Sequence, residues 1–324
     1  MTDRLTAVDR RRFLAGAASL GAAAAAPRAR AADVVATTPF ARIERLAPGV
    51  WAVISSPVNP DGSFNPQTLC NGGLVAGEDR VVAIDGYFQP AGAAWLQAQA
   101  EKLAGRRVTD VVVTHFHADH TGGLAGFFDG GEGPQIIATE TTRKLIIERL
   151  SAPNDIDGSP FAAPSIRPPV LPTQILSDEA KTLPFDIGGR TLTLDHKRGH
   201  TPSDLAVHVD DTVFAGDLVW ADYFHNYVDA IPSDLRRSAG DLLKDRKRTI
   251  VTGHGRLDTA RNLAPYLDLL DHVEEKARAA HGAGKSVEDG AADFSVPETL
   301  GPWTLFNPRY YETAFRAWYR ELDG

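Results

Sequence analysis

A dense cluster of metal-ligand side chains directly follows a short β-branched segment. Residues 108–113 are rich in valine, which predicts a buried strand. The next residues hold three imidazoles and one carboxylate, His115, His117, Asp119 and His120. Neutral imidazole suits zinc, and carboxylate adds a hard anionic ligand. Because alternate residues can project together, we expect the first two histidines to share one ion and the other two side chains to serve a second.

Three later positions each place one ligand where a predicted strand meets a loop. His200 stands in Gly199-His-Thr-Pro202, just before the strand predicted at 205–209. Asp217 follows the strand 213–214, and His254 follows the strand 249–251. Small neighbours such as Gly216 and Gly253 permit close approach of the backbone. Five histidines and two aspartates are enough for two zinc ions with four or five ligands each, once a bridging water is added.

Strands and helices alternate along the rest of the chain, which predicts a layered α/β fold. Further strands are expected at 50–54, 69–75, 81–84 and 190–194, and helices at 91–103, 141–150, 258–281 and 306–321. Residues 153–184 contain seven prolines and are expected to form a long lid or surface loop. Nothing resembling a linker divides residues 32–324, so we predict one domain there.

The ordered motifs resemble those of the metallo-β-lactamase superfamily: Thr114-His-Phe-His-Ala-Asp-His120, then Gly199-His-Thr201, Gly216-Asp217 and Gly253-His-Gly255. The resemblance implies a four-layer αββα sandwich with metals at the sheet edges. By the same resemblance, the first zinc takes His115, His117 and His200, the second takes Asp119, His120 and His254, and Asp217 bridges both. Asp85 and Thr201 are expected to orient these ligands from behind.

Two zinc ions sharing a water would lower its pKa far below that of bulk water and supply a bridging hydroxide. This predicts a zinc hydrolase that cleaves an ester, thioester, lactone or β-lactam, with Asp119 and Asp217 as catalytic residues. An acid at position 217 resembles glyoxalase II-like thioesterases and lactonases more than dizinc β-lactamases. Two alternatives stay open: an oxygenase with one iron on His115, His200 and Asp217, acting on persulfides, and a non-catalytic metal-binding protein.

The N-terminal residues 1–31 resemble a twin-arginine export signal. Arg10-Arg-Arg12 precedes an uncharged run from Phe13 to Ala26, and Ala29-Arg-Ala31 offers a small-x-small cleavage site. The run has 14 residues, whereas a membrane-spanning helix needs roughly 20. We therefore expect a periplasmic or secreted protein with no membrane anchor after the signal is removed.

Several other residues have two interpretations. His196 competes with His200 as a ligand, Tyr223 and His225 either line the substrate pocket or pack within a loop, and Cys70 is expected to be a small buried thiol. The net charge of −8 argues against nucleic acid as a partner and leaves a small molecule as the expected substrate. The sequence does not decide between a monomer and a homodimer.

Overall fold

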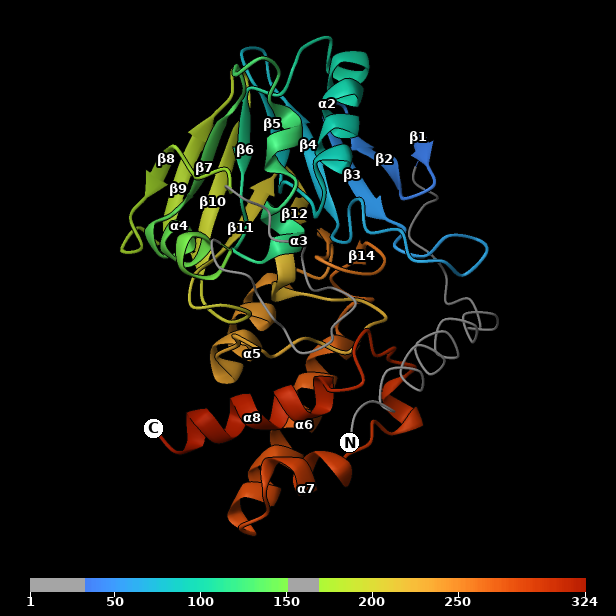
Figure 1. The fold of residues 1–324 in the computed structure, drawn as a ribbon, viewed down its shortest axis with the longest axis vertical. Coiled ribbons are helices and arrows are strands. Elements are labelled where there is room, and N and C mark those ends of the chain that lie inside the picture. The colour runs from blue at the N-terminus through green and yellow to red at the C-terminus, as the bar shows by residue number, and fades with distance from the viewer. Residues whose placement is uncertain (1–32, 151–168) are drawn as a thin grey trace, which may run out of the picture.

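Two β-sheets stack face to face and are covered by helices on their outer sides (Figure 1). The computed structural model describes residues 33–150 and 169–324. The first sheet has eight strands in sequence order: β1 (Asp33–Thr38), β2 (Ala41–Ala47), β3 (Val50–Ser55), β4 (Gly72–Ala76), β5 (Val81–Ile84), β6 (Asp110–Val112), β7 (Gln135–Thr139) and β8 (Gln174–Leu176). Neighbouring strands are antiparallel from β1 to β5 and parallel from β5 to β8.

The second sheet has six strands, and in this sheet too each strand lies beside its neighbours in the chain. From one edge to the other these are β14 (Asp258–Thr259), β13 (Thr249–Val251), β12 (Thr212–Phe214), β11 (Asp204–Val209), β10 (Thr191–Lys197) and β9 (Thr182–Asp186). Strands β12 and β13 are parallel, and the other neighbouring pairs are antiparallel.

Alternating side chains of single strands divide the interior into layers. In β5, Val82 and Ile84 face the second sheet, whereas Val81 and Ala83 pack on the opposite side of the first sheet. Successive side chains of a strand point to opposite faces of its sheet, so all of them are buried only where both faces of the sheet are covered. The run of four buried residues in β5 is therefore the sequence signature of a central strand in a covered sheet.

The covering helices complete a four-layer αββα sandwich, as the sequence motifs imply. The helices are α2 (Pro90–Ala104), α3 (Ala118–Thr121), α4 (Glu140–Leu145), α5 (Pro232–Leu242), α6 (Pro265–Gly282), α7 (Val287–Ala292) and α8 (Tyr310–Leu322). Leu96 of α2 packs on the first sheet. Leu235 of α5, Leu269 of α6 and Trp318 of α8 share one core with Val213 of the second sheet.

Two sequence expectations about local structure are wrong. Of the proline-rich segment, residues 151–168 lie outside the described part of the chain, but β8 and β9 are strands rather than loop. Proline fits in β9 because β9 is an edge strand, where a missing N–H is tolerated. The helix expected at 258–281 begins only at Pro265, which occupies its first turn, and β14 precedes it.

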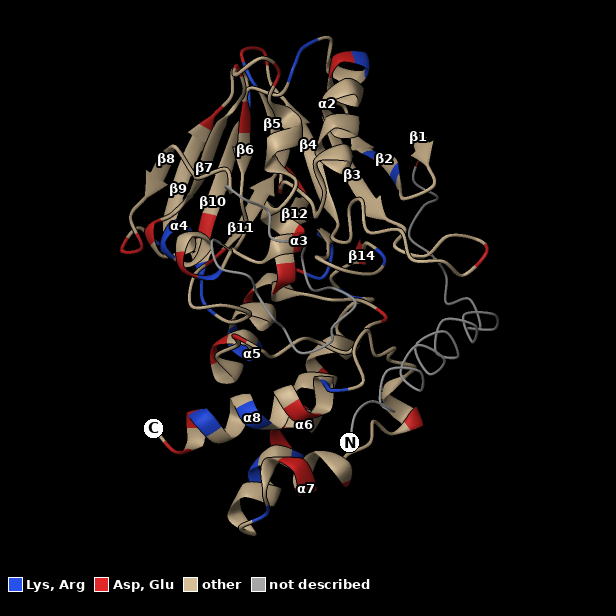
Figure 2. Cartoon of the chain, in the orientation of Figure 1, with Lys and Arg blue, Asp and Glu red and all other residues tan. Residues whose placement is uncertain are grey.

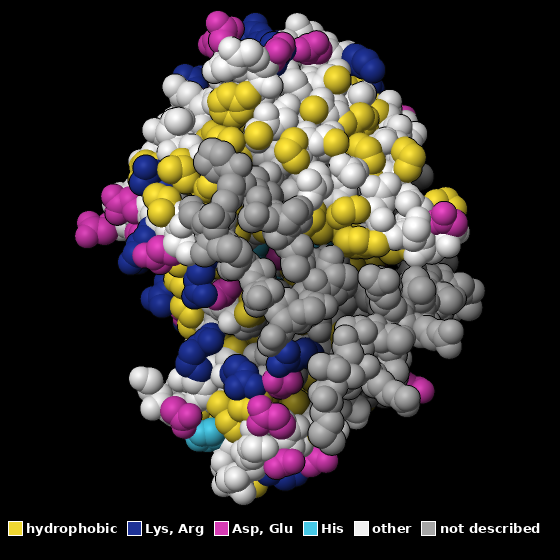
Figure 3. Space-filling model, in the orientation of Figure 1, with side chains coloured by type: hydrophobic (Ala, Val, Ile, Leu, Met, Phe, Trp, Pro, Cys, Tyr) yellow, Lys and Arg dark blue, Asp and Glu magenta, His cyan; other side chains and the backbone are white. Residues whose placement is uncertain are grey.

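Acidic and basic side chains are interspersed over the surface (Figures 2 and 3). On α8, for example, Arg316 lies 3.0 Å from Glu288 of α7 and 2.8 Å from Glu312 of its own helix. Within the described residues, no helix is both long and apolar enough to cross a bilayer. The export signal expected at residues 1–31 lies outside the described residues.

Candidate active site

The seven predicted ligands meet where strand ends of the two sheets converge. His115 and His117 follow β6, and Asp119 and His120 belong to the short helix α3. His200 stands in the turn between β10 and β11, Asp217 follows β12, and His254 follows β13. Parallel neighbours end at the same edge of a sheet, so β12 and β13 deliver their ligands side by side.

Close approach at this edge requires glycine at two positions. A Cβ atom at position 253 would lie 1.9 Å from Oδ1 of Asp217 and would displace that carboxylate. Gly216 has a φ of +50°, and a Cβ there would lie 2.9 Å from Thr114. Both glycines therefore allow Asp217 to sit between the loops of the two sheets.

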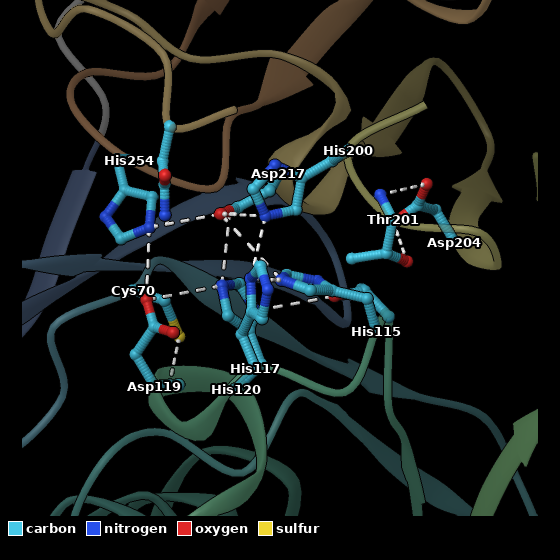
Figure 4. A network of polar contacts seen from close by, with 12 residues as sticks. Cys70, His115, His117, Asp119, His120, His200, Thr201, Asp204, Asp217 and His254 are labelled. Carbon is cyan, nitrogen blue, oxygen red and sulfur yellow. Dashed lines mark hydrogen bonds and ion pairs between the residues drawn. The ribbon is translucent and has the colours of Figure 1, made fainter. Parts of the chain in front are cut away.

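The first group of ligand atoms consists of three imidazole nitrogens and one carboxylate oxygen (Figure 4). Nδ1 of His117 lies 3.1 Å from Nε2 of His115 and 2.9 Å from Nε2 of His200. Oδ2 of Asp217 lies 3.3 Å from His200 Nε2 and 3.8 Å from His115 Nε2. Tetrahedral zinc with bonds of about 2.0 Å holds its ligand atoms about 3.3 Å apart, so these separations fit one ion.

The second group lies on the other side of the same carboxylate. Nε2 of His254 is 3.2 Å from Oδ2 of Asp119 and 3.4 Å from Oδ2 of Asp217. Nε2 of His120 is 3.2 Å from Oδ1 of Asp217 and 3.6 Å from Oδ2 of Asp119. Asp217 therefore has one oxygen or the other near every histidine of both groups except His117.

Some buried atoms of the site have no hydrogen-bond partner within the described chain. Nε2 of His120 and Oδ1 of Asp217 are buried and form no hydrogen bond within the described chain. A buried polar atom without a partner costs free energy, so native structures rarely retain one. A cation between these atoms would satisfy both, and the donor set of imidazoles and carboxylates fits a pair of divalent metal ions.

Burial and neighbouring charge set the protonation of the ligands. Burial holds the pKa of His115 and His200 well below the usual value, so both rings are neutral with a free lone pair. Burial alone would raise the pKa of Asp217, but nearby imidazoles outweigh it and hold the carboxyl ionised. Burial also opposes the charged form of His254, yet Asp217 and Asp119 raise its pKa to about 9. A metal at the second group must therefore compete with a proton.

Asp85 orients His120 from behind. Oδ2 of Asp85 lies 2.8 Å from Nδ1 of His120, and Thr114 donates its backbone N–H to Oδ1 of Asp85 at 2.7 Å. With Nδ1 paired to a carboxylate, His120 presents Nε2 to the metal group. Thr201 lies further away: its hydroxyl donates to Asp204 at 2.8 Å, which stabilises the turn after His200.

Asp229 orients His117 in the same way, and the sequence analysis did not predict this residue. Oδ2 of Asp229 lies 2.9 Å from Nε2 of His117, which leaves Nδ1 of that ring for the metal. Arg149 lies 3.8 Å from the same carboxylate. His117 and Asp229 are 112 residues apart, and Asp229 belongs to no recognised motif. The sequence spacing therefore gave no signal for this contact.

Of the two interpretations given for His225, its position favours packing, because the ring is buried behind His200. Its side chain has no exposed surface, and Nε2 lies 3.0 Å from Nδ1 of His200. On its other side, Nδ1 of His225 lies 2.9 Å from the hydroxyl of Tyr266. Burial lowers the pKa of His225 to about 3, so the ring is neutral.

The remaining predicted residues are placed as follows. Tyr223 stacks on Phe306 with ring centroids 4.0 Å apart, and Phe306 lies 5.7 Å from the His254 ring. His196 pairs with Ser203 at 2.9 Å and is absent from both ligand groups. Cys70 is a buried thiol whose Sγ donates to the backbone oxygen of Asp119 at 3.0 Å.

Comparison with known proteins agrees with this geometry. The family model described as the metallo-beta-lactamase superfamily matches residues 66–254, which is more than half of the chain. The chain belongs to the metallo-beta-lactamase superfamily. It is 29% identical over 220 residues to a hydroxyacylglutathione hydrolase from Shewanella sp. (strain ANA-3), covering 66% of this chain and 70% of that one. It is 25% identical over 217 residues to a metallo-beta-lactamase type 2 from Bacillus sp. (strain 170), covering 64% and 76%.

Solved structures share the fold of this superfamily member. A metallo-beta-lactamase from Pontibacter korlensis matches with a TM-score of 0.56 and 22% identity, over 71% of this chain and 99% of that one. The sec-alkylsulfatase Pisa1 from Pseudomonas sp. matches with a TM-score of 0.65 and 16% identity, over 86% of this chain and 49% of that one. At these identities the likeness establishes the fold alone.

Proposed function

We propose that this superfamily member is an exported dizinc hydrolase of an ester, thioester, lactone or β-lactam. The observation that carries the proposal is the position of Asp217, whose two oxygens lie 3.2–3.4 Å from His120, His200 and His254. A carboxylate so placed could contact a cation in each group, and the ligand atoms of each group lie within 4.8 Å of one another. A single-iron oxygenase would need only the first group.

Seven side chains of the protein would hold the metal ions, and one of them, Asp119, would also accept a proton. When bound, two zinc ions would activate water and polarise the substrate oxygen. His115, His117 and His200 would hold the first ion, and Asp119, His120 and His254 would hold the second. Asp119 has the most exposed side chain of the seven ligands, at 24%. Its carboxylate is therefore the ligand most open to solvent, where it can accept a proton during the reaction.

A thioester is the first substrate class to test, because the more similar curated relative is a hydroxyacylglutathione hydrolase. The mature chain, produced without residues 1–31 and reconstituted with zinc, would be assayed on acyl thioesters, lactones, aryl esters and a chromogenic β-lactam. We expect turnover of at least one class that disappears in the Asp217→Ala variant. Two bound zinc ions with no turnover of any class would favour a metal-binding protein. One bound iron with O₂ uptake on persulfides would favour the oxygenase.

Export rests on residues 1–31 and is tested separately. A reporter fused to residues 1–35 should reach the periplasm by the twin-arginine route. Replacing both Arg10 and Arg11 with lysine should retain the reporter in the cytoplasm. Unchanged export of this double variant would contradict the proposed route and would leave the proposed hydrolase chemistry untouched.

A further inference from the structure

Two buried polar side chains behind His200 have no part in the chemistry proposed above. His225 and Tyr266 form a chain of contacts that leads away from the first ligand group, with 3.0 Å from His200 Nδ1 to His225 Nε2 and 2.9 Å from His225 Nδ1 to Tyr266 Oη. The side chains of His200 and His225 have no exposed surface, and Tyr266 is 1% exposed. Water therefore cannot replace either contact.

The hydrogen-bond chain has one direction that suits metal binding. His200 offers Nε2 to the first ligand group, so its proton must reside on Nδ1, which donates to Nε2 of His225. The proton of His225 then resides on Nδ1 and donates to the Tyr266 hydroxyl. Trp220 and Tyr227 pack around the His225 ring, with centroids 4.9 and 5.2 Å away, and restrict its rotation.

Tyr266 belongs to α6, which lies beyond the residues 66–254 matched by the family model. We propose that His225 and Tyr266 are positioning residues that fix the tautomer and the ring orientation of His200, so that α6 sets the metal affinity of the first site. The inference rests on the proposed metal centre but not on its substrate. Partners of metal-bound histidines commonly change metal affinity by about 10- to 100-fold when they are removed.

The test is zinc affinity of the full mature chain, measured by competition with a chromophoric chelator. Tyr266→Phe deletes only the hydroxyl and keeps the ring in the core. We expect zinc to bind about tenfold more weakly at one site and unchanged at the other. Tyr227→Phe is the matched control, because Tyr227 also packs on His225 but makes no hydrogen bond to it. This control should bind zinc as the wild type does.

Two further variants separate positioning from packing. His225→Gln keeps a hydrogen-bond acceptor near His200, whereas His225→Leu removes it, so the glutamine variant should retain more affinity at the weakened site. The absorption bands of the cobalt-substituted protein should change in Tyr266→Phe and in His225→Leu. Wild-type affinity and spectra in both of these variants would overturn the inference and leave the proposed hydrolase intact. A wild-type chain that binds no zinc would overturn the proposed function itself, together with the inference.

Discussion

Nε2 of His120 and Oδ1 of Asp217 face each other at 3.2 Å, and neither atom forms a hydrogen bond within the described chain. Both side chains are almost fully buried, so bulk water has little access to these atoms. His120 cannot turn away, because its Nδ1 is held by Asp85 at 2.8 Å. The same carboxylate reaches the first ligand group through Oδ2. One aspartate thus links two groups of side chains that could each hold a cation.

Replacing Asp217 should remove metal from both groups. In Asp217→Ala we expect zinc to fall below one ion per chain and kcat/KM to fall by more than about 100-fold. Removal of a residue that only supports a metal ligand typically costs at most about 100-fold, so a larger loss indicates a ligand. The measurement is elemental mass spectrometry together with steady-state kinetics. Asp211→Asn, at an exposed turn, is the control and should behave as the wild type. A fully loaded, active Asp217→Ala variant would contradict the bridging role.

Asp229 should matter through His117 rather than through substrate. Asp229→Asn keeps the shape but weakens the contact to His117 Nε2, so we expect zinc affinity at the first site to fall about 10-fold. With saturating zinc, KM should change little. The check is zinc titration beside kinetics at high zinc. A large rise in KM with unchanged zinc affinity would show that Asp229 acts on substrate instead.

His196 should be dispensable for metal binding. Its Nε2 pairs with Ser203, and the ring lies outside both ligand groups. His196→Ala should keep the wild-type metal content and lower the free energy of unfolding by about 1 kcal/mol, since one partly buried hydrogen bond is lost. His200→Ala, by contrast, should lose metal from the first site. Loss of zinc from the His196→Ala protein would mean that this histidine is a ligand.

Asp204 should make folding stability depend on pH. Burial raises the pKa of its carboxyl to about 7, despite donation from Thr201. Between about pH 4 and 7 the unfolded chain has released this proton and the folded chain still holds it, so its contribution to stability falls as pH rises and levels off above pH 7. Urea unfolding of the metal-free protein across this range should show a flatter profile for Asp204→Asn. Parallel profiles of variant and wild type would contradict the raised pKa.

The sequence could predict that the seven candidate ligands come together, because each of them stands beside a strong local signal. Segments of β-branched residues locate β6 and β13, and glycine accompanies Asp217 and His254 at the strand ends. Once parallel strands end at one edge, their ligands must meet there. The alternation of strands and helices predicted only a layered α/β fold, and the αββα order of the layers came from the resemblance of the motifs to those of the superfamily.

Long-range partners could not be predicted in this way. Asp229 contacts His117 from 112 residues away, and His225 contacts His200 from 25 residues away and Tyr266 from 41 residues away. No spacing in the sequence marks any of these contacts. Strand β9 was missed because proline argues against a central strand, and only the sheet order reveals that β9 is an edge. Such facts depend on tertiary packing, which single-sequence periodicity does not contain.

The number of metal ions per chain tests the central claim most directly. Elemental mass spectrometry of protein purified without added metal, with protein concentration from amino-acid analysis, gives this number without any assumption about substrate. Our account predicts two zinc ions per chain. One iron per chain would contradict the dizinc centre and favour the oxygenase, and a folded chain that holds no metal and cannot be reloaded would contradict the metal centre altogether.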